Sequence, residues 1–561
     1  MFLPTNKTEM QALGWDKLDI ILVSGDTYID SPYIGIAVIG NLLASDGYRV
    51  GVIAQPDITG STDIMRLGEP GLFWGITAGS IDSMVANFTA SGKRRRQDDL
   101  TPGGDNNKRP DRATIVYANL IRRYFKNTKP LVLGGIEASL RRVAHYDHWD
   151  AKIRKSVLFD AKADILVYGM AEKSLLELAG KIKNNEDINE IRGLCYISKS
   201  PKTGYLLLPS YDAVSADKQK FIEMFHLFCQ NNDPLTAQGL CQLQDTRYLV
   251  HNPPSQSMNQ QELDHVFDLD YQRDVHPYYK KQGLVKALET IKFSLTTHRG
   301  CYGECNFCSI TVHQGRTVIS RSEGSIIKEA TTIAKLPDFK GYIMDVGGPT
   351  ANMYAIECAR KLKSGSCTNK RCLFPKKCRQ LPLDHRPQIN LLQKISQLPG
   401  VKKVFVASGL RYDMVLDDHK SGLDYLREIV KHHVSGQLKI APEHSESRVL
   451  AAMGKPGPGY LVKFRAEFKR LNKESGQRQF LTYYLIAAHP GCELADMRAL
   501  KKFASRELKM LPEQVQIFTP LPSTYSALMY YTGKDPFTGR NIFVEQEPGK
   551  KEQQKRALLH H

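Results

Sequence analysis

Two stretches of the chain alternate short apolar runs with amphipathic helical segments, and this alternation limits the fold more than any other feature. In the first stretch the buried-strand runs, each separated from the next by a helix, are residues 18–23, 48–54, 131–135 and 164–169. Because parallel neighbours need a crossover connection, this pattern predicts a doubly wound, parallel α/β sheet. Its functional edge should be formed by the loops that follow the strands, residues 24–30, 134–137 and 169–172.

The second alternating stretch, residues 288–535, contains six strand runs. Each run is followed directly by cysteine, glycine, histidine or other residues that can carry chemistry. Six such units predict a partial (β/α)6 barrel, whose active face is the carboxyl end of its strands. The predicted strands are residues 291–297, 341–346, 401–407, 437–442, 480–488 and 515–520.

Three cysteines follow the first barrel strand at C-x3-C-x2-C spacing: Cys301, Cys305 and Cys308. Soft thiolates clustered in one loop are the ligands that iron–sulfur clusters use. Because a 4Fe–4S cubane has four irons, three cysteines leave one iron able to bind a molecule from solution. Zinc sites usually take four ligands, and the nearby His298 and His313 leave zinc open as an alternative.

This spacing resembles the signature of the radical S-adenosylmethionine (SAM) superfamily, in which the open iron takes the amino and carboxylate groups of SAM. Phe307 then fits the aromatic position beside the adenine. Gly347, Gly348 and Pro349, after the second strand, resemble the Gly-Gly-Glu motif of the same superfamily. Pro-Thr replaces the Glu here, so the resemblance implies that backbone carbonyls bind the ammonium group of SAM.

The segment after the fourth barrel strand resembles the methylthiotransferase-like branch of the superfamily. By that resemblance, Glu443 and Ser445 meet the ribose of SAM, and Arg448 reaches its carboxylate. The alternative is an ordinary strand-to-helix turn with capping residues.

The N-terminal region resembles the cobalamin-binding-like Rossmann domain that precedes many radical SAM barrels, at residues 134–137 and 168–172. No Asp-x-His-x-x-Gly motif follows the first strand, so we expect a platform for substrate or partner and no cobalamin. A polar insertion at residues 93–112 is interpreted either as a mobile, solvated loop or as a basic flap over an anionic group. The polar residues from Glu137 to Trp149 leave a further polar site open.

Between the second and third barrel strands lies a Cys-rich insertion, residues 355–388, with Cys358, Cys367, Cys372 and Cys378. Their spacings fit no standard zinc pair, yet four thiolates suffice for a structural zinc or an auxiliary iron–sulfur cluster. A second metal and reduced free thiols therefore both remain open.

The predicted division is a Rossmann-like platform at 1–195, a mostly helical connector at 196–285, the radical SAM barrel at 286–535 and a polar, disordered tail at 536–561. Without a signal-peptide pattern or a long apolar run, no membrane association is expected. Eleven cysteines in such a chain favour metal use over disulfides, and a reducing cytoplasm. The net charge of +18 admits RNA or the ribosome as a partner.

Over nearly all of its 561 residues the chain resembles the YgiQ family of radical SAM proteins. The resemblance implies a metal-binding enzyme that cleaves S-adenosyl-L-methionine reductively at a 4Fe–4S cluster, with an electron from a donor such as flavodoxin or ferredoxin. Its catalytic activity starts radical chemistry on an unidentified substrate, so the residues that act on that substrate are unknown. One alternative is methylthiotransferase-like modification of tRNA or a ribosomal protein. Another is a non-catalytic iron–sulfur protein that binds RNA or the ribosome.

Overall fold

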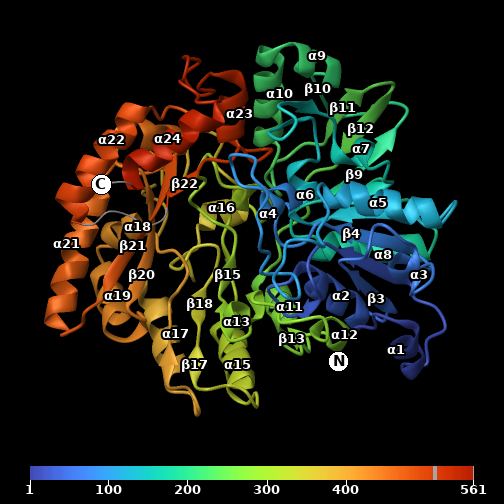
Figure 1. Ribbon diagram of the computed structural model, residues 1–561, viewed down its shortest axis with the longest axis horizontal. Helices are drawn as coiled ribbons and strands as arrows, with labels where there is room; N and C mark the ends of the chain where they lie inside the picture. The colour runs from blue at the N-terminus through green and yellow to red at the C-terminus, as the bar shows by residue number, and fades with distance from the viewer. Residues whose placement is uncertain (510–514, 560–561) are drawn as a thin grey trace. The chain divides into compact units, whose positions relative to one another are not determined.

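The structure of the protein is a computed structural model that describes residues 1–509 and 515–559 (Figure 1). The chain forms two compact units. The first comprises Met1–Met258 and His265–Lys292, and the second comprises Asn259–Asp264 and Phe293–His561. Among the described residues, no helix has the length and hydrophobicity needed to cross a membrane.

A nine-stranded sheet forms the centre of the first unit, in the order β10-β11-β12-β9-β8-β5-β4-β1-β3. From β3 to β8 all neighbours are parallel, whereas β9 is antiparallel to β8 and β12, and β12 is antiparallel to β11. The strands are β1 (Ile20–Ser24), β3 (Val50–Ala54), β4 (Phe73–Thr77), β5 (Leu131–Gly134), β8 (Ile165–Val167), β9 (Leu194–Ser198), β10 (Leu206–Leu208), β11 (Leu240–Gln244) and β12 (Arg247–His251).

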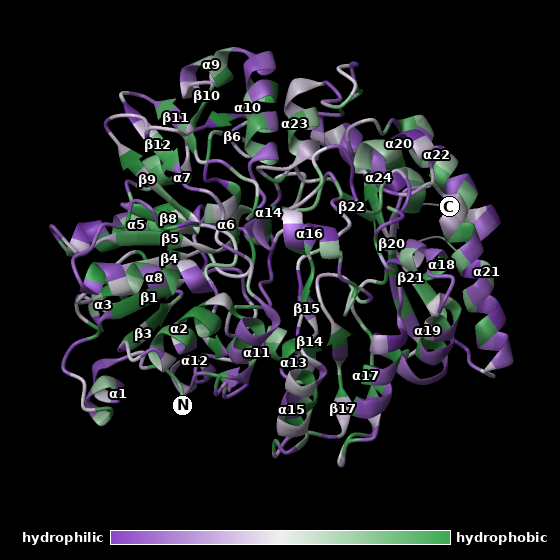
Figure 2. Ribbon diagram, turned by 180° about the vertical axis from the view of Figure 1, so that it is seen from behind, coloured by the Kyte–Doolittle hydropathy of each residue, from purple (hydrophilic) through white to green (hydrophobic). Residues whose placement is uncertain are grey.

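The parallel part of this sheet is covered on both faces. Every residue of β1 and β3 is buried, and both strands are hydrophobic along their length (Figure 2). Helices α2 (Gly35–Ser45) and α8 (Glu172–Lys183) pack together on one face. Numbered along the chain, the parallel strands have the order 2-1-3-4-5, so the order reverses between β1 and β4. In such sheets the crevice at this reversal is the usual ligand position.

The first unit also contains further helices and several short strands. They are α1 (Lys7–Ala12), β2 (Ile29–Asp30), α3 (Thr62–Met65), α4 (Ser83–Asn87), α5 (Ala113–Tyr124), α6 (Gly135–Leu140), β6 (His145–Asp147), β7 (Lys152–Arg154), α7 (Val157–Asp160), α9 (Tyr211–Ala216), α10 (Lys218–Gln230), β13 (Asp274–Val275), α12 (Pro277–Lys280) and α13 (Ala287–Ile291), with α11 (Gln260–Asp268) at the boundary between the units.

Residues 196–285, which the sequence predicted to be a mostly helical connector, contain helices α9 to α12 but also contribute strands to the sheet of the first unit. They complete β9 and supply β10, β11 and β12, which extend the sheet. The apolar pattern is broken there by Gln242 and Gln244, which are nevertheless buried. Their side-chain carbonyls accept hydrogen bonds from Ala144 N at 3.1 Å and Ser156 N at 3.0 Å. Internal pairing thus makes these polar residues compatible with a buried strand.

The second unit contains the predicted partial (β/α)6 barrel, with each strand parallel to the next. β14 (Ser294–Thr296) pairs with β18 (Asp345–Gly347), and β17 (Tyr342–Ile343) pairs with β19 (Lys403–Val404). A parallel bridge then joins Leu410 to Ile440. Beyond it, β20 (Gln437–Glu443) pairs with β21 (Phe480–Ala487), which pairs with β22 (Val515–Ile517).

Helices surround these strands and bury their apolar faces in one continuous core. The elements are β15 (His298–Arg299), α14 (Ile310–His313), β16 (Ile319–Ser320), α15 (Glu323–Ala334), α16 (Ala359–Ser364), α17 (Arg386–Ser396), α18 (Tyr412–Asp417), α19 (Gly422–Glu428), η1 (Ile429–His433), α20 (Ser447–Met453), α21 (Gly459–Glu474), α22 (Leu494–Phe503), η2 (Ala504–Leu508), α23 (Tyr525–Thr532) and α24 (Pro548–Leu559).

Helix α24 corrects the prediction of a disordered tail at 536–561. Lys551, Gln554 and Leu558 are buried, and their spacing places them on one helix face. Gln554 accepts a hydrogen bond from Ala488 N at 3.0 Å and donates one to Cys492 O at 3.1 Å. The helix is therefore docked at the end of β21, and residues 560–561 lie outside the described part of the chain.

Candidate active site

The three predicted cluster cysteines lie in one loop, which connects the antiparallel pair β15 and β16. Gly300 begins this loop with φ +80°, and a Cβ there would stand 2.1 Å from the carbonyl oxygen of Thr317. Only glycine fits such a position. The loop thus leaves the first barrel strand by a turn that the sequence enforces locally.

The loop brings the three thiols close to one another. Gly303 N donates to Cys301 Sγ at 3.3 Å, and a Cβ on Gly303 would lie 3.2 Å from Cys301 Sγ and 3.6 Å from Cys305 Sγ. Burial and the neighbouring Cys305 raise the pKa of Cys301 to about 11 and that of Cys308 to about 12. Iron would deprotonate such thiols on binding.

This donor set fits a cubane held through three of its irons. Within residues 1–509 and 515–559, no three His, Cys, Asp or Glu side chains are grouped so as to hold a single metal ion. In a cubane each cysteine binds a different iron, so the fit depends on the shared loop, the soft donors and the backbone N–H directed at sulfur.

Two neighbouring helices anchor the cluster loop. Asn306 N donates to Met453 O at 2.9 Å and Asn306 Nδ2 to Ala452 O at 2.8 Å, both in α20. Ser526 N, in α23, donates to Asn306 O at 2.9 Å. Phe307 packs against the barrel core, with its ring edge-on to His489. The loop is therefore held at the face where the barrel strands end.

The two glycines at the end of β18, Gly347 and Gly348, are required by packing inside the protein. A Cβ on Gly348 would lie 2.6 Å from the ring of His298, and one on Gly347 would lie 3.3 Å from Ser408. The Gly347 carbonyl accepts hydrogen bonds from Thr297 N at 2.6 Å and Thr297 Oγ1 at 3.1 Å. The carbonyl oxygen of Gly347 is therefore engaged within the protein.

The residues expected to meet SAM at and after the end of β20 point in different directions: Glu443 toward the cluster loop and Arg448 toward Asp496. Glu443 is buried with φ +67°, its carboxylate is 3.7 Å from Lys455 Nζ, and burial raises its pKa. Its charge also acts on Cys308, so it faces the cluster loop. Ser445 is buried nearby.

Arg448 departs from its expected role. Its side chain is 56% exposed, and its guanidinium pairs with Asp496 at 2.8 Å and Glu493 at 3.5 Å instead of pointing toward the cysteines. The strand-to-helix turn therefore places Glu443 near the cysteines and directs Arg448 to the surface of α22.

A different arginine lies beside the cysteines. Arg411 Nη1 donates to Cys305 Sγ at 3.7 Å, and Asp413 holds its guanidinium. Arg411 belongs to none of the sequence motifs described above. Its place just past the third barrel strand was the only sequence signal of its role.

Three of the four insertion cysteines gather near Tyr302 of the cluster loop. Cys358 and Cys372 are buried with Tyr302 in one apolar cluster, against which Cys378 packs in part, while Cys367 is half-exposed. Burial raises the pKa of Cys372 to about 11. All eleven cysteines of the chain, each within the described residues, are free of disulfides.

The Cys-rich insertion is strongly basic and is attached to the cluster loop. From Cys358 to Leu383 it carries eight Lys or Arg and no Asp or Glu, and α16 is visibly hydrophilic (Figure 2). Lys361 Nζ donates to Glu304 Oε1 at 3.3 Å, and Arg371 Nη1 donates to Glu304 O at 3.1 Å. The cations left exposed are Arg360, Lys363, Lys370, Lys376 and Arg379.

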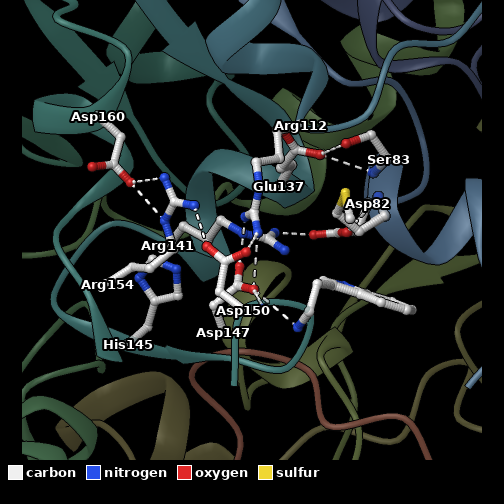
Figure 3. Close-up of polar contacts among 12 residues, drawn as sticks. Asp82, Ser83, Arg112, Glu137, Arg141, His145, Asp147, Asp150, Arg154 and Asp160 are labelled. Carbon is white, nitrogen blue, oxygen red and sulfur yellow. Dashed lines mark hydrogen bonds and ion pairs between the residues drawn. The ribbon is translucent and has the colours of Figure 1, made fainter. Parts of the chain in front are cut away.

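In the first unit, the polar residues around Glu137 form an internal network (Figure 3). Glu137 accepts hydrogen bonds from Ser83 N at 2.8 Å and Thr114 N at 3.1 Å, and also from both hydroxyls. Ser83 and Thr114 lie in the first turns of α4 and α5, where backbone N–H groups favour an anion. Arg141 pairs with Asp82, so these charges are satisfied within the unit.

Arg109 of the polar insertion lies in the crevice at the strand-order reversal, whereas residues 93–97 of the same insertion are exposed to solvent. Arg109 is fully buried and donates to Asp26 Oδ1 at 2.7 Å, Asp98 Oδ2 at 3.0 Å and Ala78 O at 2.6 Å. Asp26 follows β1 and Ala78 follows β4. A Cβ on Gly25 would come within 2.3 Å of Ala78 O. Arg109 and its partners Asp26 and Asp98 therefore occupy this crevice.

Comparisons with known proteins identify the family to which the chain is similar. A family model described as Radical SAM N-terminal matches residues 2–294. The UPF0313 protein FN0734 of Fusobacterium nucleatum is 59% identical over 555 residues, covering 99% of this chain and 98% of the relative. A UPF0313 protein of Thermotoga petrophila is 49% identical over 549 residues, covering 97% and 96%.

Two solved structures share the fold. One is the radical SAM methyltransferase TsrM from Kitasatospora setae with cobalamin and a 4Fe–4S cluster bound, with TM-score 0.53 and 16% identity over 91% of this chain and 77% of that one. The other is the cobalamin-dependent SAM radical enzyme OxsB with aqua-cobalamin bound, with TM-score 0.50 and 13% identity over 94% and 57%. These similarities confirm the predicted fold class, a Rossmann-like domain followed by a radical SAM barrel.

Proposed function

The chain belongs to the UPF0313 (YgiQ) family and is an enzyme of the radical SAM class, and from that premise we propose that it cleaves SAM at a 4Fe–4S cluster held by Cys301, Cys305 and Cys308. The observation that carries this proposal is that the three thiols share one anchored loop at the carboxyl end of the barrel strands. When bound, the cluster supplies the electron that splits SAM into methionine and a 5′-deoxyadenosyl radical, which takes a hydrogen atom from the substrate.

The chain's own residues bind and orient SAM in this proposal. Phe307 packs beside the adenine, and the carbonyls of Gly348 and Pro349 accept from the ammonium group. Glu443 and Ser445 meet the ribose hydroxyls. These roles are supported by the burial of Glu443, whose charge acts on Cys308, and by the burial of Ser445. Arg448 is left out, because its guanidinium is occupied by Asp496 at the surface.

We assign no cobalamin to the first unit, although TsrM and OxsB bind it. The support is Arg109, which fills the crevice where a ligand of this fold would bind and is paired there with Asp26 and Asp98. A spectrophotometric titration of the full chain with hydroxocobalamin tests this assignment. Saturable binding at micromolar concentration would contradict it.

The basic insertion is proposed as the docking surface for an acidic electron donor such as flavodoxin or ferredoxin. It is attached to Glu304, next to Cys305, and its segment from Cys358 to Leu383 contains no Asp or Glu among the exposed cations. Weak electron-transfer encounters use small charged surfaces, which accelerate association. RNA or the ribosome is the alternative occupant of this surface, and salt-sensitive RNA binding that is lost on charge reversal there would favour it.

Sulfur insertion of the methylthiotransferase kind needs a second cluster, and the candidate for it within the described residues is the group of Cys358, Cys372 and Cys378, with Cys367. Their position beside Tyr302 keeps that candidate open. A protein that holds its cluster but does not turn SAM over would instead fit a non-catalytic RNA-binding role. We place the protein in a reducing cytoplasm, because a large chain with eleven cysteines, none of them in a disulfide among the described residues, favours metal use.

Replacement of Cys305 by alanine tests the proposed function. The variant is expected to lose most of its iron and its dithionite-dependent formation of 5′-deoxyadenosine. Cys229→Ala, in the first unit, is the control and should retain both. Undiminished 5′-deoxyadenosine formation by the Cys305 variant would refute the assignment.

A further inference from the structure

Arg411 contacts a cluster cysteine from the start of α18. Its Nη1 donates to Cys305 Sγ at 3.7 Å, and a Cβ on Gly303 would come within 2.9 Å of the same nitrogen. The Arg411 side chain is 9% exposed, so the contact is shielded from water. Hydrogen bonds to cluster sulfur, net charge and burial are the means by which a protein sets a cluster's reduction potential.

Asp413 fixes the direction of this guanidinium. Arg411 Nε donates to Asp413 Oδ1 at 2.8 Å and Nη2 donates to Oδ2, the two-point contact typical of Arg–carboxylate pairs. An arginine guanidinium is not deprotonated in proteins. The positive charge is therefore permanent and is aimed at Cys305.

A chain of buried hydrogen bonds holds the Arg411 backbone. Arg411 N donates to Asn352 Oδ1 at 2.8 Å, and Asn352 Nδ2 donates to Arg411 O and to His385 Nε2, each at 3.1 Å. His385 Nδ1 in turn donates to Asp418 Oδ2 at 2.7 Å, and both side chains are fully buried. Ser421 Oγ also donates to Asp418. Such a fully bonded network favours one geometry.

We propose that Arg411 is a positioning residue that sets the reduction potential of the cluster bound by Cys301, Cys305 and Cys308, an inference that rests on the proposed function. One-electron reduction adds one negative charge to the cluster. A fixed guanidinium bonded to a ligand sulfur stabilises that reduced state more than the oxidised one, and Asp413 opposes the effect while it keeps the geometry. The electron comes from an external reductant, dithionite in vitro.

The test is an anaerobic dithionite titration of the reconstituted full chain, followed by EPR. Arg411→Gln is expected to lower the equilibrium constant for reduction at least tenfold, a fall of about 59 mV for a one-electron couple. Arg411→Lys keeps the charge and should shift the potential less than half as far. Asp413→Asn removes the opposing negative charge and should raise the reduction potential. Arg448→Gln is the matched control, because Arg448 pairs with Asp496 instead of a cysteine.

An Arg411→Gln protein with its full iron content and the wild-type potential would overturn the proposal. If the Arg411→Gln protein holds no iron, the Asp413→Asn protein provides the test, because it retains the guanidinium. A reduction potential of the Asp413→Asn protein that is equal to or lower than that of the wild type would overturn the proposal. Wild-type protein that holds no iron after reconstitution would instead contradict the proposed function, so the two failures are distinguishable.

Discussion

Replacement of Arg109 by methionine should destabilise the first unit by about 3–4 kcal/mol, because it leaves two buried carboxylates without their counter-ion. The Arg109 side chain is 0% exposed, and those of Asp26 and Asp98 are 1% and 6% exposed. Methionine retains the apolar stem, so the change removes charge and hydrogen bonds with little loss of volume.

The magnitude follows from the partners that remain. Removal of one member of a buried ion pair typically costs about 3–5 kcal/mol. Asp26 would still accept from Ser80 N at 2.6 Å, and Asp98 from Leu100 N at 3.0 Å and Thr101 Oγ1 at 3.1 Å. These bonds offset part of the loss, which places the expected value in the lower half of the range.

Urea unfolding followed by tryptophan fluorescence measures this effect in the full chain. The three tryptophans, Trp15, Trp74 and Trp149, all belong to the first unit, so the signal reports that unit. Arg94→Met is the matched control. Its side chain is 50% exposed and pairs with Asp111 at 3.4 Å, so the expected loss is below about 1 kcal/mol.

A triple variant separates charge from packing. Arg109→Met combined with Asp26→Asn and Asp98→Asn removes all three charges, and should recover at least half of the lost stability. An Arg109→Met protein within about 1 kcal/mol of the control would refute the account of a closed, ion-paired crevice. A triple variant less stable than the single one would refute the electrostatic reasoning.

Three further predictions concern pH and packing. Burial lowers the pKa of Lys551 to about 8 from 10.5, so the docked α24 binds fewer protons than the undocked helix. The helix should therefore dock more strongly as pH rises from about 8 to 10.5. Limited proteolysis should show that Lys551→Met abolishes this pH dependence, whereas the exposed control Lys550→Met keeps it. Burial lowers the pKa of His145 to about 3 from 6.5, so the first unit should lose stability as pH falls through that interval. In urea titrations, His145→Gln should reduce the change in unfolding free energy by up to about 1.4 kcal/mol per pH unit. An unchanged pH dependence of that free energy would contradict this prediction. Gly348→Ala places a Cβ within 2.6 Å of the His298 ring and should weaken SAM binding at least tenfold by equilibrium dialysis without loss of iron, whereas undiminished affinity would show that the turn tolerates the side chain.

Both units could be predicted from the sequence because strand runs and their crossover helices are local patterns. The elements that were missed are those in which polar residues are buried. Gln242 and Gln244 interrupt the apolar pattern expected of a buried strand. The groups that satisfy their side chains, Ala144 N and Ser156 N, lie far away in the chain and cannot be recognised from the local sequence. Likewise, α24 has a polar composition but docks through Lys551 and a few neighbours.

In the candidate site, too, the residues of a local motif could be predicted and those that depend on long-range contacts could not. Cys301, Cys305 and Cys308 were recognised from spacing alone, because their ligand role depends on one short loop. Arg411 belongs to no local motif, since its role depends on a contact with Cys305 across 106 positions of the chain. Arg109 was equally hidden, because its partner Asp26 lies 83 positions earlier.

The most direct test of the central claim is the iron and sulfide content of anaerobically purified protein, with EPR of the dithionite-reduced form before and after addition of SAM. The account predicts about four irons per chain and a spectrum that SAM perturbs, as expected for one cubane with an open iron. About eight irons would add a second cluster at Cys358, Cys367, Cys372 and Cys378. Zinc without iron, or a cubane spectrum unchanged by SAM, would contradict the proposed function.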